Sequence, residues 1–164
     1  MQKDKNHIGT ALAFCKDVAT EIGARYSHGN ITETNMRSML VYPYMHTNIG
    51  QVSLGSPMAT VQVNIMIADR VNTITTENQG LNQETLYSEI GYTENNNYAM
   101  VLQQLYVDFA IAVKKYEELY YNALEIQRPI LFTAFEETYD DIIAGFTVSL
   151  NIDVANPIVT DGYC

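Results

Sequence analysis

The sequence of 164 residues contains no tryptophan, only two cysteines and only four prolines. The two cysteines, Cys15 and Cys164, are far apart in the chain, so they do not form the disulfide framework that staples small secreted domains. The cysteine content therefore favours a reducing cytoplasm. Cys15 also falls on an apolar helical stripe, which predicts an inert thiol in the core.

Basic residues are scarce as well. Nine lysines and arginines stand against 19 aspartates and glutamates, which gives a formal net charge of −10. Because binding to nucleic-acid phosphates needs a basic surface, this balance argues against sequence-specific nucleic-acid recognition. The chain has no apolar stretch of about 18 residues, and no apolar run follows its first lysines, so we expect neither a membrane span nor a signal peptide.

What the chain does contain is an ordinary apolar content with few charges. Hydrophobic residues make up 47% of the sequence and charged residues 17%, and there are 12 tyrosines. A chain of this size forms one domain, here residues 1–164, and buries roughly 70% of its unfolded surface. Tyrosine is enriched in interfaces, so the composition is compatible with a protein covered by partners, and equally with a Tyr-rich soluble domain.

Two segments have the three- and four-residue spacing of apolar side chains that is typical of amphipathic helices. The first covers residues 8–22 and ends at Gly23. The second begins after a candidate N-cap at Asn97 and ends before Pro129. Its apolar and aromatic stripe consists of Tyr98, Val101, Leu102, Leu105, Tyr106, Phe109, Val113, Tyr116 and Tyr120.

Two other segments alternate between apolar and polar residues, which predicts strands. Residues 61–67 form the first. Residues 146–155 form the second, and their polar positions face away from the apolar ones. The apolar face of this last strand, which we expect to pack on the helices, consists of Phe146, Val148, Leu150, Ile152 and Val154.

Weaker patterns complete the expected fold. We expect a strand near 38–45, a turn at Asn48–Gly50, a short strand near 51–54, another strand over 129–135, and an acidic turn after it. Runs of strands with few helices favour an α+β domain, in which two main helices pack on a small antiparallel sheet. The long polar segment 72–97 is expected to be a loop, and residues 156–164 an extended C-terminal tail.

The sequence shows no pattern of catalytic, cofactor-binding or metal-ligating residues. His7, His28 and His46 are isolated and lack the spacing of a zinc site. The carboxylates within 136–141 lack the alternating oxygen ligands and the central glycine of a calcium loop, so a solvated turn is the expected structure. We therefore expect no enzyme activity, no cofactor and no metal.

One segment resembles a known family. The sequence FEETYDDIIAGFTVSLNIDVANP, residues 135–157, with a cysteine soon after, resembles the C-terminal segment of tail-terminator and neck-ring proteins of tailed bacteriophages, especially the crAss-like phages that infect Bacteroidales. The upstream segments 40–46 and 61–72 look like two strands of that family, in the same order. The residues that correspond are Phe135, Asp141, Gly145, Phe146 (where tryptophan is usual), Asn156, Pro157 and Cys164.

The resemblance implies a tail-terminator-like fold and a structural virion protein, assembled in the bacterial host cytoplasm. Such proteins form closed rings of six or twelve copies between portal and tail, through which DNA passes. Portal, neck and tail proteins are the implied partners. Candidate inter-subunit contacts lie in the long loop, the acidic turn and the tail: Glu77, Glu84, Tyr87, Glu89, Ile90, Tyr92, Glu94, Glu136, Glu137, Asp140, Asp141, Asn156, Pro157 and Cys164.

Three other functions stay open on the residues alone. The first is a non-enzymatic adaptor or chaperone of assembly with the same fold. The second is an enzyme that uses the carboxylates of 136–141 together with Asp69, which would require both segments to meet in a pocket. The third is a cargo-binding domain in which Tyr42, Tyr44 and the tyrosines of the second helix surround a ligand.

Overall fold

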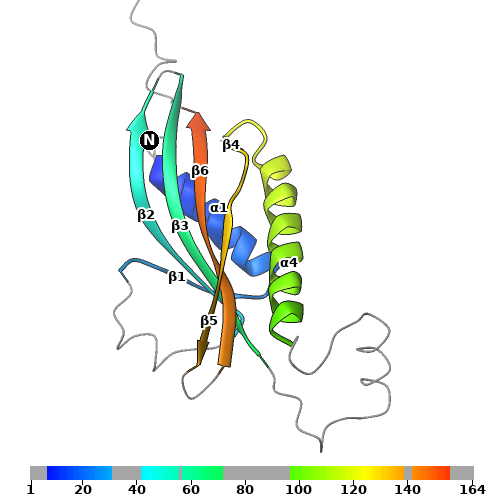
Figure 1. Ribbon diagram of the computed structural model, residues 1–164. Helices are drawn as coiled ribbons and strands as arrows, with labels where there is room; N and C mark the ends of the chain where they lie inside the picture. Colours follow the sequence, from blue (N-terminus) through cyan, green and yellow to red (C-terminus); the bar gives the residue numbers. More distant parts are fainter. Residues whose placement is uncertain (1–6, 31–41, 56, 72–96, 139–141, 156–164) are drawn as a thin grey trace, which may run out of the picture.

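The computed structural model describes residues 7–30, 42–55, 57–71, 97–138 and 142–155. In these ranges two helices pack against one face of a six-stranded sheet (Figure 1), which confirms the predicted α+β class. Helix α1 is shifted by one residue from the predicted 8–22, and α4 begins at the predicted N-cap Asn97 and ends at Leu119, one residue before the last member of the predicted stripe. The elements are α1 (His7–Glu21), β1 (Arg25–His28), β2 (Tyr44–Leu54), β3 (Met58–Arg70), α4 (Asn97–Leu119), β4 (Leu124–Ile126), β5 (Phe132–Thr138) and β6 (Ile142–Ala155).

The sheet is built around three long antiparallel strands, β2, β3 and β6, in the order β1-β2-β3-β6-β4. Two short strands share the far side of β6. Strand β4 pairs Leu124 with Val154 near one end, and β5 pairs Phe132 with Val148 and continues toward the other end. On the opposite side of the sheet, β1 is parallel to β2 and pairs only with residues 44–47.

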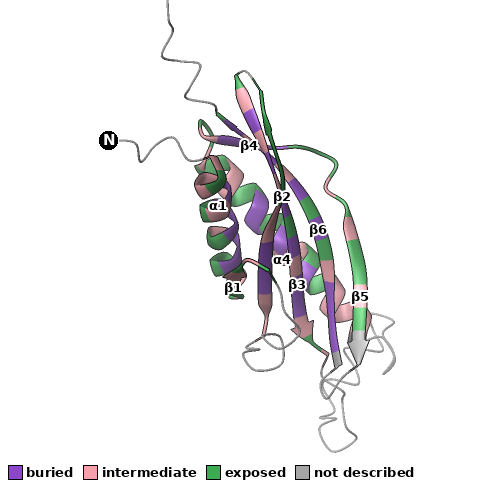
Figure 2. Cartoon of the chain, turned by 90° about the vertical axis from the view of Figure 1, so that its left-hand side faces the viewer, coloured by how far each residue is buried: buried purple, intermediate pink, exposed green. Residues whose placement is uncertain are grey.

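The core lies between the sheet and the two helices. Val61 of β3, Ile152 of β6 and Phe14 of α1 are fully buried, and Phe109 of α4 is 1% exposed. Buried and exposed residues alternate along β6 in Figure 2, as expected for a strand with one face on the core. Burying each large apolar side chain contributes roughly 1.5–3 kcal/mol, so this layer accounts for most of the stability.

The predicted inward face of the last strand is confirmed. Val148, Leu150, Ile152 and Val154 belong to the buried core, and Phe146 packs against it while half-buried. The cavity between Phe14, Phe109 and Leu150 in this core is too small for a water molecule. Cys15 is buried there, and burial raises the pKa of its thiol to about 12, so it stays protonated and inert as predicted.

The predicted turn at Asn48–Gly50 is wrong. Strand β2 continues through these residues, with a β-bulge between Ile49 and Val52, and the connection to β3 falls at 55–57. A Cβ at Gly50 would lie 2.8 Å from Gln62 Oε1 and 2.9 Å from Asn64 Nδ2, so the flexible ends of these two side chains occupy the space beside the glycine. Gly50 therefore marks a β-bulge and not the predicted turn.

The predicted acidic turn is also wrong for two of its four members. Glu136 and Glu137 belong to strand β5, where they pair with Ala144 and Ile143. The reason is that β6 begins at Ile142, earlier than its clearest alternation indicates, and this early segment supplies a partner for the acidic residues. Asp140 and Asp141 lie outside the described residues.

Strands β1 and β4 were not predicted. They contain only four and three residues, which is too short for a periodic pattern. Strand β1 also makes the sheet mixed, because its pairing with β2 is parallel, whereas a purely antiparallel sheet was expected. The residues of the expected strand near 38–45 are described only from Tyr42 onward, and strand β2 begins at Tyr44.

Candidate assembly surface

The sheet face that points away from the helices carries neutral polar side chains. Gln62 Nε2 donates a hydrogen bond to Ser149 Oγ at 3.0 Å, and Ser149 Oγ donates to Asn64 Oδ1 at 3.3 Å. Residues opposite one another across paired strands share a face, so the register defines this surface. Its central rows contain no charged residue: His46, Met66 and Thr147; Asn48, Asn64 and Ser149; and Gln62 and Asn151.

Two carboxylates do occur at one end of this face, where the exposed Glu125 lies opposite Asp153, and the charge of Asp153 is engaged. Gln127 Nε2 donates to both carboxylate oxygens of Asp153 at 3.0 Å, and the Thr60 hydroxyl also donates to Asp153. The centre of the outer face is therefore mainly a surface of amides and hydroxyls on a chain whose net charge is −10. Neutral surfaces of this kind permit two copies of an acidic protein to approach one another.

The structure brings together histidines that appear isolated in the sequence. His46 Nε2 lies 2.7 Å from the Gly29 carbonyl oxygen, so we assign the ring proton to Nε2. His46 Nδ1 is then free to accept a hydrogen bond from the Ser27 hydroxyl at 2.6 Å. The Tyr44 hydroxyl contacts the same Ser27 oxygen, and the ring of Tyr44 stacks on that of His46. We call these four residues the β1 latch.

The β1 latch holds a neutral imidazole. Burial lowers the pKa of His46, the nearby His28 lowers it further, and the hydrogen bond to Gly29 opposes both effects. A serine beside a neutral histidine is also the arrangement of some nucleophilic enzymes. Here, however, both ring nitrogens are occupied by contacts to β1, so the observed role of His46 is to fasten β1 to β2. The sequence feature that could have indicated the β1 latch is a pair of polar aromatic residues, Tyr44 and His46, at alternate positions of one strand.

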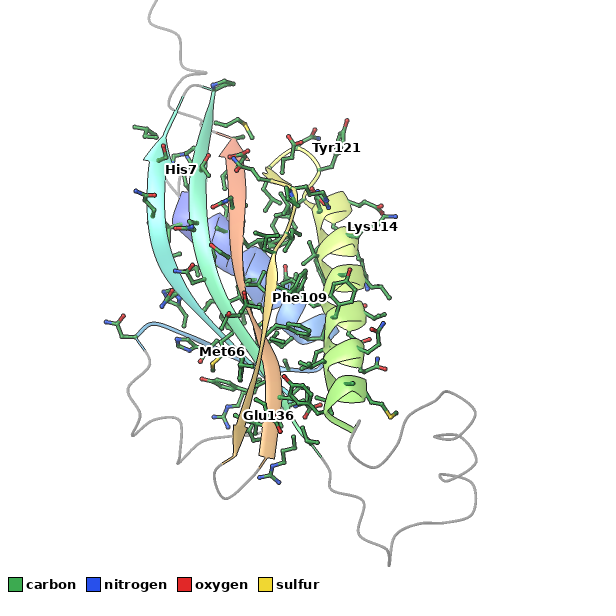
Figure 3. The ribbon with its side chains drawn as sticks, in the orientation of Figure 1. His7, Met66, Phe109, Lys114, Tyr121 and Glu136 are labelled. Atoms are coloured by element: carbon green, nitrogen blue, oxygen red, sulfur yellow. The ribbon has the colours of Figure 1, made fainter. Side chains whose placement is uncertain are left out.

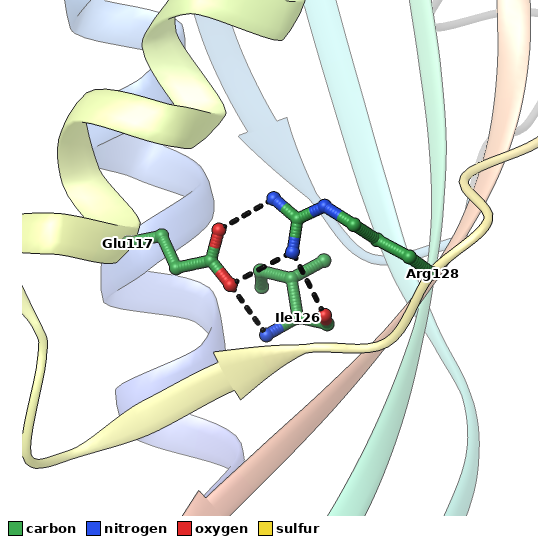
Figure 4. Close-up of polar contacts among 3 residues, drawn as sticks. All are labelled: Glu117, Ile126 and Arg128. Carbon is green, nitrogen blue, oxygen red and sulfur yellow. Dashed lines mark hydrogen bonds and ion pairs between the residues drawn. The ribbon is translucent and has the colours of Figure 1, made fainter.

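The edge of the sheet formed by β4 is closed by an ion pair (Figure 4). Glu117 of α4 and Arg128 meet through two contacts, of 3.0 and 2.6 Å. Glu117 Oε1 also accepts the backbone N–H of Ile126 at 3.1 Å, and Arg128 Nη1 donates to the Ile126 carbonyl at 3.1 Å. The hydrogen bond from Arg128 lowers the pKa of Glu117. Both backbone groups of Ile126 that β6 leaves unused are thus occupied.

The edge formed by β5 is protected differently. Glu136 is exposed near the end of this strand (Figure 3), and Glu137 follows it within β5. Charged residues on an edge strand discourage pairing with another chain, because pairing would bring that charge against a backbone or a second side chain. Glu136 is the predicted contact residue whose side chain the structure describes.

The edge formed by the second half of β2 has neither protection. Beyond Thr47, where β1 ends, no strand of the described residues pairs with the outer side of β2. This segment, Asn48–Leu54, contains no charged residue, and we call it the open edge. Its apolar side chains Val52 and Leu54 are 43% and 69% exposed.

Most of the predicted contact residues lie outside the described residues. These are the loop positions Glu77, Glu84, Tyr87, Glu89, Ile90, Tyr92 and Glu94, the acidic Asp140 and Asp141, and the tail positions Asn156, Pro157 and Cys164. The sequence analysis did not identify the residues that define the surface here, which are the open edge and the neutral outer face. The signal available was an uncharged run of eleven residues, Tyr44–Leu54.

The arrangement required by the alternative enzyme is met only in part. Asp69 and Glu136 both lie opposite Ala144, one on each side of it, so a strand separates them. Two strand spacings amount to about 10 Å between backbones. Within the described ranges, no group of three His, Cys, Asp or Glu residues is placed to hold a metal ion.

The tyrosines of the alternative cargo-binding site do not gather. Tyr42 lies under the guanidinium of Arg70 at 5.3 Å, and Tyr44 belongs to the β1 latch. Tyr120, by contrast, donates to Asp17 of α1 at 2.7 Å, on the helical side of the sheet. The tyrosines of the second helix and of β2 therefore serve separate contacts.

Comparison with known proteins does not place the chain in a family. No family model matches it, and no curated protein matches it. Among the helices that the structure describes, none is long and apolar enough to cross a membrane.

Proposed function

We propose that this chain is a structural subunit that assembles into a closed ring in the neck or tail of a tailed bacteriophage. The observation that carries the proposal is the open edge of β2, which is uncharged and exposes Val52 and Leu54. An unpaired, uncharged strand edge is a template for another chain. The resemblance of residues 135–157 to tail-terminator and neck-ring proteins supports the same function.

The fold is suited to such a role. Both helices cover one sheet face, and none of the helices that the structure describes covers the other, so the subunit offers a hydrogen-bonding surface with a neutral centre to neighbours. Interfaces with many hydrogen-bonding side chains are typical of proteins that also exist separately, because such side chains are well hydrated before assembly. Contacts between identical subunits around a ring are heterologous and must close, which needs at least two distinct surfaces on each copy. The open edge offers a further contact, from one ring to the next.

The charge of the chain fits a channel for DNA. Each copy carries a net charge of −10, and acidic walls do not bind phosphates. Glu136 on the edge of β5 is a described carboxylate that is free to face such a channel or a basic neighbour. In the proposed assembly the portal, neck and tail proteins above and below provide those neighbours.

Imaging and mass measurement of the assembled state test this proposal. Negative-stain electron microscopy and native mass spectrometry of the purified full-length chain, alone and in purified phage particles, should show closed rings of one copy number. A chain that remains monomeric and is absent from particles would instead support the adaptor or chaperone function. A chain that is monomeric in every state and turns over a substrate would overturn the proposal.

A further inference from the structure

We infer that the open edge binds the open edge of a second copy of this chain, as an antiparallel strand pair centred on Ser53. This inference rests on the proposed assembly function and names one of its contacts. The partner is a second copy because the surface is self-complementary, and the observations on charge, apolar exposure and register each support that assignment.

Charge favours a second copy. The chain carries a net charge of −10, so two copies repel one another over most of their surfaces. The open edge, Asn48–Leu54, has no charged residue, and in the row that contains Ser53 the nearest carboxylate, that of Asp153, lies two strands away. The approach of two copies is therefore least opposed at this strip.

The other strand edges are unsuited to the same contact. The Ile126 backbone on β4 is already bound by Glu117 and Arg128. Strand β5 carries Glu136 at its exposed edge, and two such edges would place like charges together. Among the strand edges that the structure describes, the open edge is the one that is neutral, exposes apolar side chains and has no strand on its outer side.

The exposed apolar residues define the register. Val52 and Leu54 lie on either side of Ser53 in the strand, so their side chains share one face and the side chain of Ser53 points to the other. In an antiparallel pair centred on Ser53, Val52 of each copy lies opposite Leu54 of the other on one face. In this register each exposed apolar side chain of one copy lies against an exposed apolar side chain of the other copy. No other register centred within the open edge places Val52 opposite Leu54.

The length of the contact determines its strength. The bulge between Ile49 and Val52 bends β2, so regular pairing is confined to the residues beyond it. A pair this short is weak for two isolated molecules and becomes strong when several copies engage together. A twofold contact also joins two rings face to face, which converts a ring of six copies into an assembly of twelve.

Disulfide trapping tests the register directly. In an antiparallel pair, opposite Cα atoms lie about 4.5–5.5 Å apart, within the range that a disulfide spans. Ser53→Cys is introduced into full-length protein with Cys164→Ser, and Cys15 is buried, so the new thiol is the reactive one. Thr133→Cys, an equally exposed position on β5, is the matched control.

We expect Ser53→Cys to form covalent dimers roughly tenfold faster than Thr133→Cys, because pairing raises the local concentration of the second thiol. Adding Leu54→Lys should slow the Ser53→Cys reaction roughly tenfold, since each dimer loses two Val52–Leu54 contacts. Leu54 is 69% exposed, so this substitution should leave circular dichroism and the thermal transition unchanged.

Three outcomes overturn the inference. They are equal trapping rates at Ser53 and Thr133, trapping that Leu54→Lys leaves unchanged, and full hydrogen-exchange protection of residues 48–54 in the monomer, which shows that another segment of the same chain covers the edge. Rings seen by electron microscopy together with slow trapping at Ser53 would reject this contact while leaving the proposed function in place.

Discussion

The two long sides of the sheet end in opposite ways. On the β4 side, Glu117 and Arg128 occupy the backbone N–H and carbonyl of Ile126. On the β2 side, the four-residue strand β1 covers only residues 44–47, and the outer side of the seven residues beyond them has no strand partner among the described residues. Backbone groups of an edge strand that an ion pair occupies are not available for pairing with another chain. The unblocked edge, on the same sheet, is where pairing is tolerated.

The largest expected effect comes from the strand on which both edges depend. Leu150 of β6 is 1% exposed, and Leu150→Asp would bury an unpaired charge in the layer shared by both sides of the sheet. We expect a loss of ~3–5 kcal/mol in the free energy of unfolding, measured by urea denaturation.

Ser149→Asp is the control for this change, because the neighbouring residue points to the exposed outer face. It should change the free energy of unfolding by less than about 0.5 kcal/mol. Equal losses from the two substitutions would contradict the assignment of the inward face.

A smaller effect follows from opening the closed edge. Glu117→Ala removes the acceptor of the Ile126 N–H and the partner of Arg128, both partly exposed to solvent. We expect a loss of about 1–2 kcal/mol, with faster exchange of the Ile126 amide and increased self-association in sedimentation experiments. The exposed neighbour Glu118→Ala should show none of these effects, and unchanged self-association of Glu117→Ala would mean that the ion pair does not guard the edge.

The smallest effect concerns the β1 latch and depends on pH. Burial lowers the pKa of His46 below its usual 6.5, so the unfolded chain takes up this proton more readily than the folded one. The latch therefore stabilises the fold above about pH 6.5, and this contribution is lost as the pH falls through the lower pKa of the folded state. As it is lost, β1 should loosen and the open edge should lengthen.

Hydrogen exchange measures this change. Between about pH 7 and about pH 5, amides of β1 should lose protection relative to those of β4, after correction for intrinsic rates. The other titratable groups near His46 are His28, Arg25 and Tyr26 on β1 and Tyr44 on β2. His46→Gln should abolish the pH dependence, and an unchanged dependence in that variant would show that His46 is not its source.

Much of the fold was predictable because its signals are local. The apolar stripe of α4 and the alternation along β6 lie within single segments, and each segment alone determines which side of it is buried. The predictions failed at residues whose structure depends on a second strand. Gly50 suggested a turn until Gln62 and Asn64 were seen to lie against it, and Glu136 suggested a turn until β6 supplied its partner Ala144.

The sequence by itself determined the α+β class, both helices, the inward face of β6 and the inert Cys15, because hydrophobic periodicity records burial directly. Only the tertiary structure decided which edge is closed and which is open. Ser27 and His46 are separated by 19 residues, and Glu117 and Arg128 by 11, and no period links the members of either pair. Such contacts form between elements whose positions are set by core packing, so their partners become known only when the sheet is assembled.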